Sequence, residues 1–107
     1  MAAISEVQYV SISQTATTTL VAAQAAGIKV RVVEVCLVNT TAQTVTFKSG
    51  AAGTAITGAM ALGANGVLVL PHSPAGWFET AAATLLELSQ SGATQLSGAI
   101  GWVAATN

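Results

Sequence analysis

The fold is decided by one stretch, Lys29–Asn39, which reads KVRVVEVCLVN. Its β-branched residues have stiff side chains that suit the pleated surface of a sheet. Side chains alternate between the two faces of a strand, and from Val32 to Val38 both faces are apolar apart from Glu34. One face carries Val33, Val35 and Leu37, and the other carries Val30, Val32, Cys36 and Val38. A strand that is apolar on both faces is covered on both sides, so we expect another copy of the chain to supply the second cover.

The composition describes one small domain with very little charge. A chain of 107 residues is long enough for one continuous core. Charged residues make up 7% of it and the net charge is −1, whereas charged residues are about 25% of an average soluble protein. Such a chain offers no cluster of Lys and Arg for nucleic acid or for an anionic lipid surface. It also has neither an apolar run of about 18 residues nor a secretion signal, so we expect a protein that is made in a cytoplasm and binds no membrane.

The rest of the chain alternates between short apolar segments and turns rich in Gly, Asn, Pro and Ser. Residues 23–27 fit either a helical turn or a hairpin turn at Gly27, and we favour the hairpin. Asn65-Gly66 is a second hairpin signal, because both residues tolerate positive φ. Eight or nine short strands and no helix predict an all-β, antiparallel sandwich or barrel. The residues predicted to form its core are Val33, Val35, Leu37, Phe47, Leu86, Leu88, Ile100 and Trp102.

Few side chains in this sequence could carry chemistry. The single cysteine cannot form an internal disulfide, and Cys36 is predicted to be a small buried hydrophobe. His72 is the only histidine and lies in a loop between prolines, so it cannot build a metal site, and without aspartate the chain has no hydrolytic triad. Glu79 and Glu87 would form a glycosidase pair only if they faced one cleft; ion-paired or solvated positions suit them better. We predict no catalytic, cofactor-binding or metal-binding residue and no enzymatic activity.

Two further patterns have a structural and a functional interpretation. Trp77, Phe78 and Trp102 could stack against a sugar, but sugar sites also need acidic and amide groups, which are scarce here. Packing in the core or at a subunit interface is the commoner role of such residues. The triplet that begins at Asn39 matches the N-glycosylation pattern, which has meaning only in a secreted protein.

Three segments, in this order, carry a family resemblance. They read TFKSG at 46–50, LPxxPxGWFxT at 70–80, and a final strand that ends near Trp102. Together they resemble the jelly-roll head-decoration, or cement, proteins of tailed bacteriophages, over residues 21–103. The resemblance implies a β jelly roll and a homotrimer that binds the major capsid protein on the outer surface of the phage head. It implies no catalytic residue. Similar jelly rolls serve in tails and fibres, so the alternative is a recognition module that binds a host surface glycan.

The N-terminal segment, residues 1–14, lies outside the resemblance, which leaves residues 15–107 as the jelly-roll domain. One interpretation is an edge strand or a frayed terminus, which we favour. The other is an extended arm that adds a strand to a sheet edge on the capsid. The candidate capsid contacts in this segment are Ile4, Val7, Tyr9 and Ile12.

Overall fold

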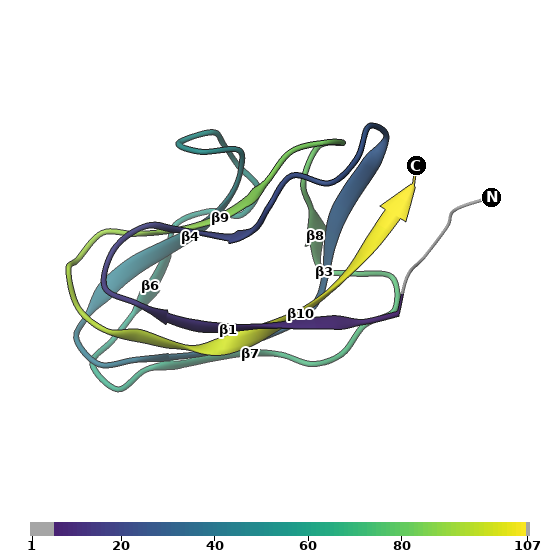
Figure 1. The fold of residues 1–107 in the computed structure, drawn as a ribbon. Coiled ribbons are helices and arrows are strands. Elements are labelled where there is room, and N and C mark those ends of the chain that lie inside the picture. The colour runs from purple at the N-terminus through teal and green to yellow at the C-terminus, as the bar shows by residue number, and fades with distance from the viewer. Residues whose placement is uncertain (1–5, 107) are drawn as a thin grey trace.

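The computed structural model describes residues 6–106, which form two antiparallel sheets packed face to face (Figure 1). Sheet A has the strand order β1-β10-β3-β7, and β8 also pairs with β3. Sheet B has the order β2-β9-β4-β5, and β6 also pairs with β4. The strands are β1 (Gln8–Gln14), β2 (Thr18–Val21), β3 (Ile28–Asn39), β4 (Gln43–Ser49), β5 (Thr54–Ala55), β6 (Met60–Leu62), β7 (Val67–Leu70), β8 (Phe78–Glu79), β9 (Leu86–Gln90) and β10 (Leu96–Thr106). The predicted all-β sandwich is confirmed.

The connections give this sandwich the interleaved topology of a jelly roll. When the two-residue strands β5 and β8 are set aside, eight strands remain. Sheet A then holds the first, eighth, third and sixth of them, and sheet B holds the second, seventh, fourth and fifth. Strands that are neighbours in a sheet are therefore mostly distant in sequence, as the two Greek keys of a jelly roll require.

Two turns that carry hairpin signals are crossings between the sheets. Gly27, at φ 80°, and Asn65, at φ 59°, do adopt the left-handed backbone of tight turns. However, β2 pairs with β9 in sheet B, while β3 pairs with β10 and β7 in sheet A, so the predicted hairpin at Gly27 is wrong. In the same way, the turn at Asn65 joins β6 of sheet B to β7 of sheet A. A turn signal specifies the local backbone and leaves the partner of the next strand open.

A β-bulge at Val33 interrupts the alternation of β3. In the pairing with β10, Val32 lies opposite Trp102 and Glu34 lies opposite Gly101, so Val33 is left without an opposite residue in this pair. Two residues on one strand that face one on the next define a bulge, which shifts the side chains that follow to the other face.

The bulge changes which residues of β3 face outward. The inward-facing residues in the core cluster are Val30 and Val32 before the bulge, and Val35 and Leu37 after it. Cys36 and Val38 point outward, and Val38 is 43% exposed. The sequence interpretation that placed these two residues on one face with Val30 and Val32 is therefore wrong, because it assumed an unbroken period of two.

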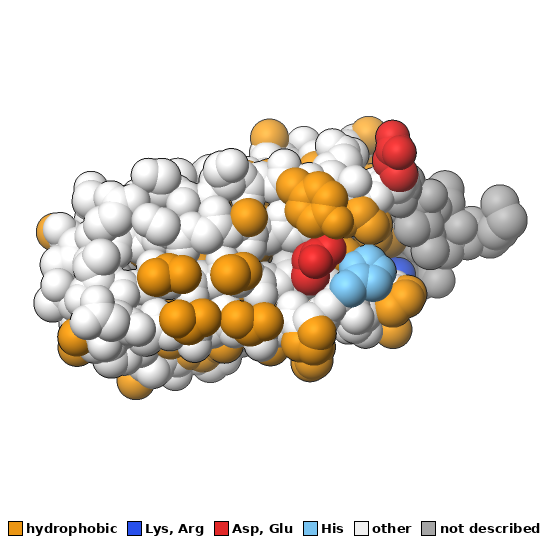
Figure 2. Space-filling model, turned by 90° about the horizontal axis from the view of Figure 1, so that it is seen from below, with side chains coloured by type: hydrophobic (Ala, Val, Ile, Leu, Met, Phe, Trp, Pro, Cys, Tyr) orange, Lys and Arg blue, Asp and Glu red, His pale blue; other side chains and the backbone are white. Residues whose placement is uncertain are grey.

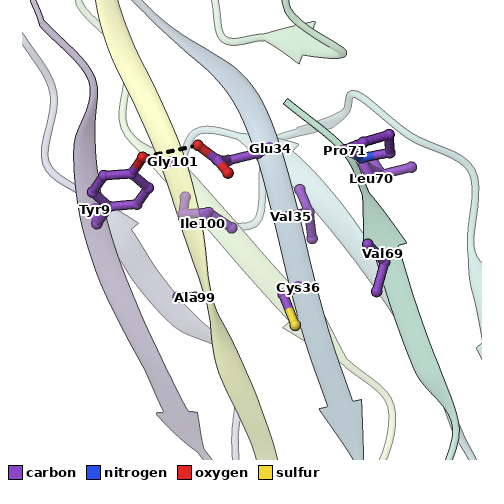
Figure 3. A pocket seen from close by; sticks show the side chains of 10 residues that line it. All are labelled: Tyr9, Glu34, Val35, Cys36, Val69, Leu70, Pro71, Ala99, Ile100 and Gly101. Atoms are coloured by element: carbon purple, nitrogen blue, oxygen red, sulfur yellow. Dashed lines mark hydrogen bonds between the residues drawn. The ribbon is translucent and has the colours of Figure 1, made fainter. Parts of the chain in front are cut away.

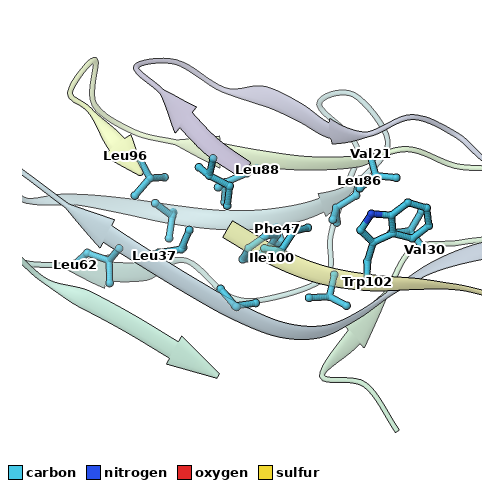
Figure 4. Packing of buried hydrophobic residues seen from close by; sticks show 14 residues of the cluster. Val21, Val30, Leu37, Phe47, Leu62, Leu86, Leu88, Leu96, Ile100 and Trp102 are labelled. Atoms are coloured by element: carbon cyan, nitrogen blue, oxygen red, sulfur yellow. The ribbon is translucent and has the colours of Figure 1, made fainter. Parts of the chain in front are cut away.

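The core lies between the two sheets, where side chains from both inner faces meet (Figure 4). All eight residues that were predicted to form the core are buried. Phe47 of β4 is fully buried, and the centre of its ring is 4.7 Å from that of Phe78 in the opposite sheet.

A row of buried amide side chains closes one end of the sandwich. Gln14 Nε2 donates to Gln90 Oε1 at 2.8 Å, Gln90 Nε2 donates to Gln43 Oε1 at 3.3 Å, and Gln43 Nε2 donates to Asn39 Oδ1 at 2.8 Å. The four residues lie at the ends of β1, β9, β4 and β3, so the row links both sheets. The amide nitrogen of Asn39 donates to three backbone carbonyls, and its residue is 1% exposed. In the folded protein this amide nitrogen therefore has no room for an attached glycan.

The position of Phe47 predicts a large loss of stability on truncation. Phe47→Ala should lower the free energy of unfolding by about 3–5 kcal/mol, because it removes a buried ring and leaves a cavity. Thr19→Ala, at an exposed position of sheet B, should change it by about 0.5 kcal/mol or less. Urea denaturation followed by tryptophan fluorescence measures both values. Equal midpoints for the two variants would contradict the assignment of the core.

Candidate functional site

The outer face of sheet A carries the largest exposed apolar side chains of the strands. We call Cys36, Val38, Val67 and Val69 the apolar strip. Cys36 lies opposite Val69, and Val38 lies opposite Val67, so the four form two adjacent rows across β3 and β7. Val67 and Val69 are each 58% exposed. Figure 2 shows this face, with apolar side chains gathered beside an acidic side chain and the histidine.

Beside the strip, a row of three residues crosses sheet A and leaves a hollow at its centre. Tyr9 of β1 lies opposite Gly101 of β10, and Gly101 lies opposite Glu34 of β3. Because Gly101 has no side chain, the Tyr9 hydroxyl reaches across it and donates to Glu34 Oε1 at 3.1 Å (Figure 3). A Cβ atom added at Gly101 would lie 2.7 Å from Cγ of Glu34. A glycine at this position is therefore what allows the contact.

This space, which we call the Glu34 hollow, has a volume of about 200 Å³. Its other walls are largely apolar and include Val69 and Leu70 of β7 and Pro71, which follows that strand. Sites for small molecules usually measure about 300–1,000 Å³ and enclose most of the ligand. The Glu34 hollow is smaller and open, so it suits a single side chain better than a metabolite.

The charge in the hollow belongs to Glu34. Its Oε1 atom accepts the hydrogen bond from Tyr9 and lies 3.4 Å from Nδ1 of His72, which is charged only when protonated. The hydrogen bond to Glu34, and then its negative charge, raise the pKa of Tyr9 above 10.0. Tyr9 therefore remains a donor at neutral pH. Within residues 6–106, no Lys or Arg lies within ion-pairing distance of Glu34.

The basic residues nearest in sequence are engaged elsewhere. Lys29 Nζ lies 2.9 Å from Oε2 of Glu79, and an Arg31 guanidinium nitrogen lies 3.0 Å from Oε1. The hydrogen bond from Lys29 is the main cause that lowers the pKa of Glu79; burial opposes this effect and Arg31 adds to it. The predicted ion-paired role is thus confirmed for Glu79. Glu87 is buried on sheet B and accepts a hydrogen bond from the amide of Ala52 at 3.1 Å, so the two glutamates belong to different sheets.

The three aromatic residues considered as a sugar platform do not share a surface. Trp102 belongs to the core cluster. Phe78 packs against that cluster and its ring contacts the ring of Phe47. Trp77 is 45% exposed, and its indole nitrogen donates to the carbonyl of Pro71 at 2.8 Å. The preference for core packing is confirmed for Phe78 and Trp102.

The candidate capsid contacts of the N-terminal segment occupy different environments. Ile4 lies outside the described residues. Val7 is half-buried, and Ile12 is a core residue at 3% exposure. Tyr9 is 68% exposed and lines the Glu34 hollow. Residues 8–14 form the edge strand β1, which pairs with β10 along its whole length.

Two site features escaped the sequence interpretation. Cys36 is exposed, so the prediction that it is buried is wrong, and the cause is the bulge before it. The sequence interpretation took Glu34 only as a break in an apolar face, although an isolated acidic residue in an otherwise apolar strand is itself a signal of a possible site. The role of Gly101 depends on which strands lie beside β10, and the sequence around Gly101 does not specify those neighbours.

The described part of the chain has no metal-binding cluster and no helix that could span a membrane. Among residues 6–106, no group of three or more His, Cys, Asp and Glu side chains could hold a metal ion. The same part of the chain has no helix with the length and apolar character that crossing a membrane requires. Comparisons with protein families, curated proteins and solved structures find no match for this chain. The fold itself therefore defines the class, an antiparallel jelly-roll β-sandwich, and the resemblance to decoration proteins has to be tested by experiment.

The contact between Tyr9 and Glu34 can be tested directly, because Tyr9 is the single tyrosine of the chain. Titration followed by ultraviolet absorbance should give a pKa above 10.0 for the wild type. In Glu34→Gln the pKa should fall toward 10.0, since the negative charge that disfavours the phenolate is gone. Glu87→Gln removes the same charge from the other sheet and should leave the titration unchanged. The same pKa in all three proteins would show that the contact is not formed in solution.

Proposed function

We propose that this protein is a non-enzymatic structural protein of a phage virion, which binds the outer surface of the head as a homotrimer and stabilises it. The observation that carries this proposal is the apolar strip, which no other part of residues 6–106 covers. Contiguous exposed apolar surface is typical of sites where another protein binds. The proposal thus rests on a surface made for contact, together with the family resemblance in the sequence.

The edge of sheet A supports the same proposal. β7 is an edge strand and reads VLVL, without a charge or an internal proline. Edge strands of proteins that stay monomeric are usually protected by charged residues, prolines or bulges, because an open edge can pair with another chain. An unprotected edge that adjoins an apolar strip suits a surface that is covered in an assembly, and we assign this cover to a neighbouring copy.

Stabilising a head requires binding and rigidity, and no reaction. A trimer presents three copies of its capsid-binding surface at fixed positions. Once one copy is bound, the others bind at a high effective concentration, so weak single contacts add up to a durable attachment. In this arrangement the apolar strip faces the neighbouring copy, and the β1 edge near Tyr9 is the part of the same sheet left for the major capsid protein.

The oligomeric state is the first test. Light scattering after size exclusion should give the mass of a trimer for the wild type at micromolar concentration. Val69→Lys places a charge in the apolar strip and should yield a monomer, because burying an unpaired charge at an interface is costly. Thr19→Lys adds the same charge at an exposed site on sheet B and should remain a trimer. A wild type that is monomeric would contradict the proposed assembly.

The copy number in purified virions decides between head and tail. A decoration protein should be present in hundreds of copies per particle, as counted by quantitative mass spectrometry against the major capsid protein. Purified protein should also raise the temperature at which undecorated heads disrupt. A handful of copies per particle would instead indicate a tail or fibre protein, and absence from virions would reject the proposal.

A further inference from the structure

The starting point is Glu34, whose nearest basic side chain within residues 6–106 is His72, at 3.4 Å from Oε1. Its side chain is 30% exposed and lies in a hollow whose other walls are largely apolar. Tyr9 and His72 both approach Oε1, and among residues 6–106 no donor is found for Oε2. Charged groups that are partly withdrawn from water usually have a partner of opposite charge. The hollow therefore has room, and an oxygen, for an incoming cation.

Its dimensions indicate what kind of cation fits. A volume of about 200 Å³ can take one long side chain. The Tyr9 ring, which is 68% exposed, borders the carboxylate and offers a π face to a cation. A planar guanidinium can stack on such a ring while it donates to a carboxylate, and an ammonium on an apolar stem can also enter.

A second copy of the chain is a poor source of this cation. Lys29 and Arg31 are both held by Glu79 of their own chain. Lys48 lies directly opposite Glu87 in the pairing of β4 with β9. A neighbouring copy would have to break an ion pair to supply Lys29 or Arg31, and it could offer Lys48 only from the outer face of its sheet B.

We propose that the Glu34 hollow receives an Arg or Lys side chain of a partner protein other than this chain. The cation pairs with Oε2 of Glu34, its stem packs on Leu70 and Pro71, and Tyr9 flanks it. The hollow adjoins the apolar strip at the row of Cys36 and Val69, so a partner bound there lies beside the interface assigned to the neighbouring copy. The inference rests on the proposed function only in that this face of sheet A docks on another protein.

Two peptides of equal shape test the chemistry of the hollow. The probe is acetyl-Val-Arg-Val-amide, and its neutral isostere has citrulline in place of arginine. Amide chemical shifts of the full chain should move saturably at Tyr9, Glu34 and Gly101 with the arginine peptide, with a dissociation constant on the order of millimolar. The citrulline peptide should bind about three- to tenfold more weakly, because it lacks the charge that pairs with the partly exposed carboxylate of Glu34.

Variants show whether Glu34 is responsible. Glu34→Gln should bind both peptides equally, whereas Glu87→Gln, which has the same net charge, should keep the preference for arginine. Equal binding of the two peptides to the wild type, a preference that survives in Glu34→Gln, or shifts located elsewhere would overturn the inference. Propylguanidinium binding as tightly as the arginine peptide would also overturn it, since the site would then serve a small molecule.

Two further results separate this inference from the proposed function. If Glu34→Lys dissociates the trimer, the hollow is occupied by a second copy and the inference is wrong. If purified heads bind the wild type and Glu34→Lys equally well, the inference fails while the decoration function stands. If the peptides are discriminated but no head binds the protein, the hollow is correctly assigned and the decoration function is rejected.

Discussion

The β-bulge at Val33 is the constraint on which the surface of this protein depends. It places one extra residue in β3 opposite β10, so inward and outward positions exchange along the strand. Before the bulge, alternate side chains fill the core; after it, Glu34, Cys36 and Val38 come to the outside. If Val33 were instead paired as a regular strand residue, with no bulge, the apolar strip would point into the sandwich and the core positions after it would point into water, because a shift of one residue reverses both faces of a strand.

The inner half of the fold could be predicted from local pattern. Alternation identified Phe47, Leu86 and Leu88 as core residues because their strands are regular and one face of each is buried. The partners of the strands could not be predicted in the same way. In a jelly roll a tight turn leads to the opposite sheet as readily as to an adjacent strand. Asn65-Gly66 is a turn, as predicted, but the strands before and after it, β6 and β7, belong to different sheets and do not form a hairpin.

The candidate site was harder to predict, because it is a property of three strands at once. Tyr9, Gly101 and Glu34 are far apart in sequence and meet through two separate strand pairings. The motifs that carry the family resemblance include neither Tyr9 nor Glu34. The hollow exists because Gly101 has no side chain. A glycine in a strand gives no indication, from the sequence alone, that its missing side chain makes room for a site.

The row of amides at one end of the sandwich has a consequence for the conditions that the protein tolerates. Gln14, Gln90, Gln43 and Asn39 join the sheets through groups that neither gain nor lose protons between acid and alkali. Hydrogen bonds between neutral groups are also almost insensitive to dissolved salt, which screens charges. The hydrogen bonds at this end of the sandwich therefore depend little on pH or salt concentration. Ion pairs between carboxylates and lysines in the same place would weaken at extreme pH and at high salt.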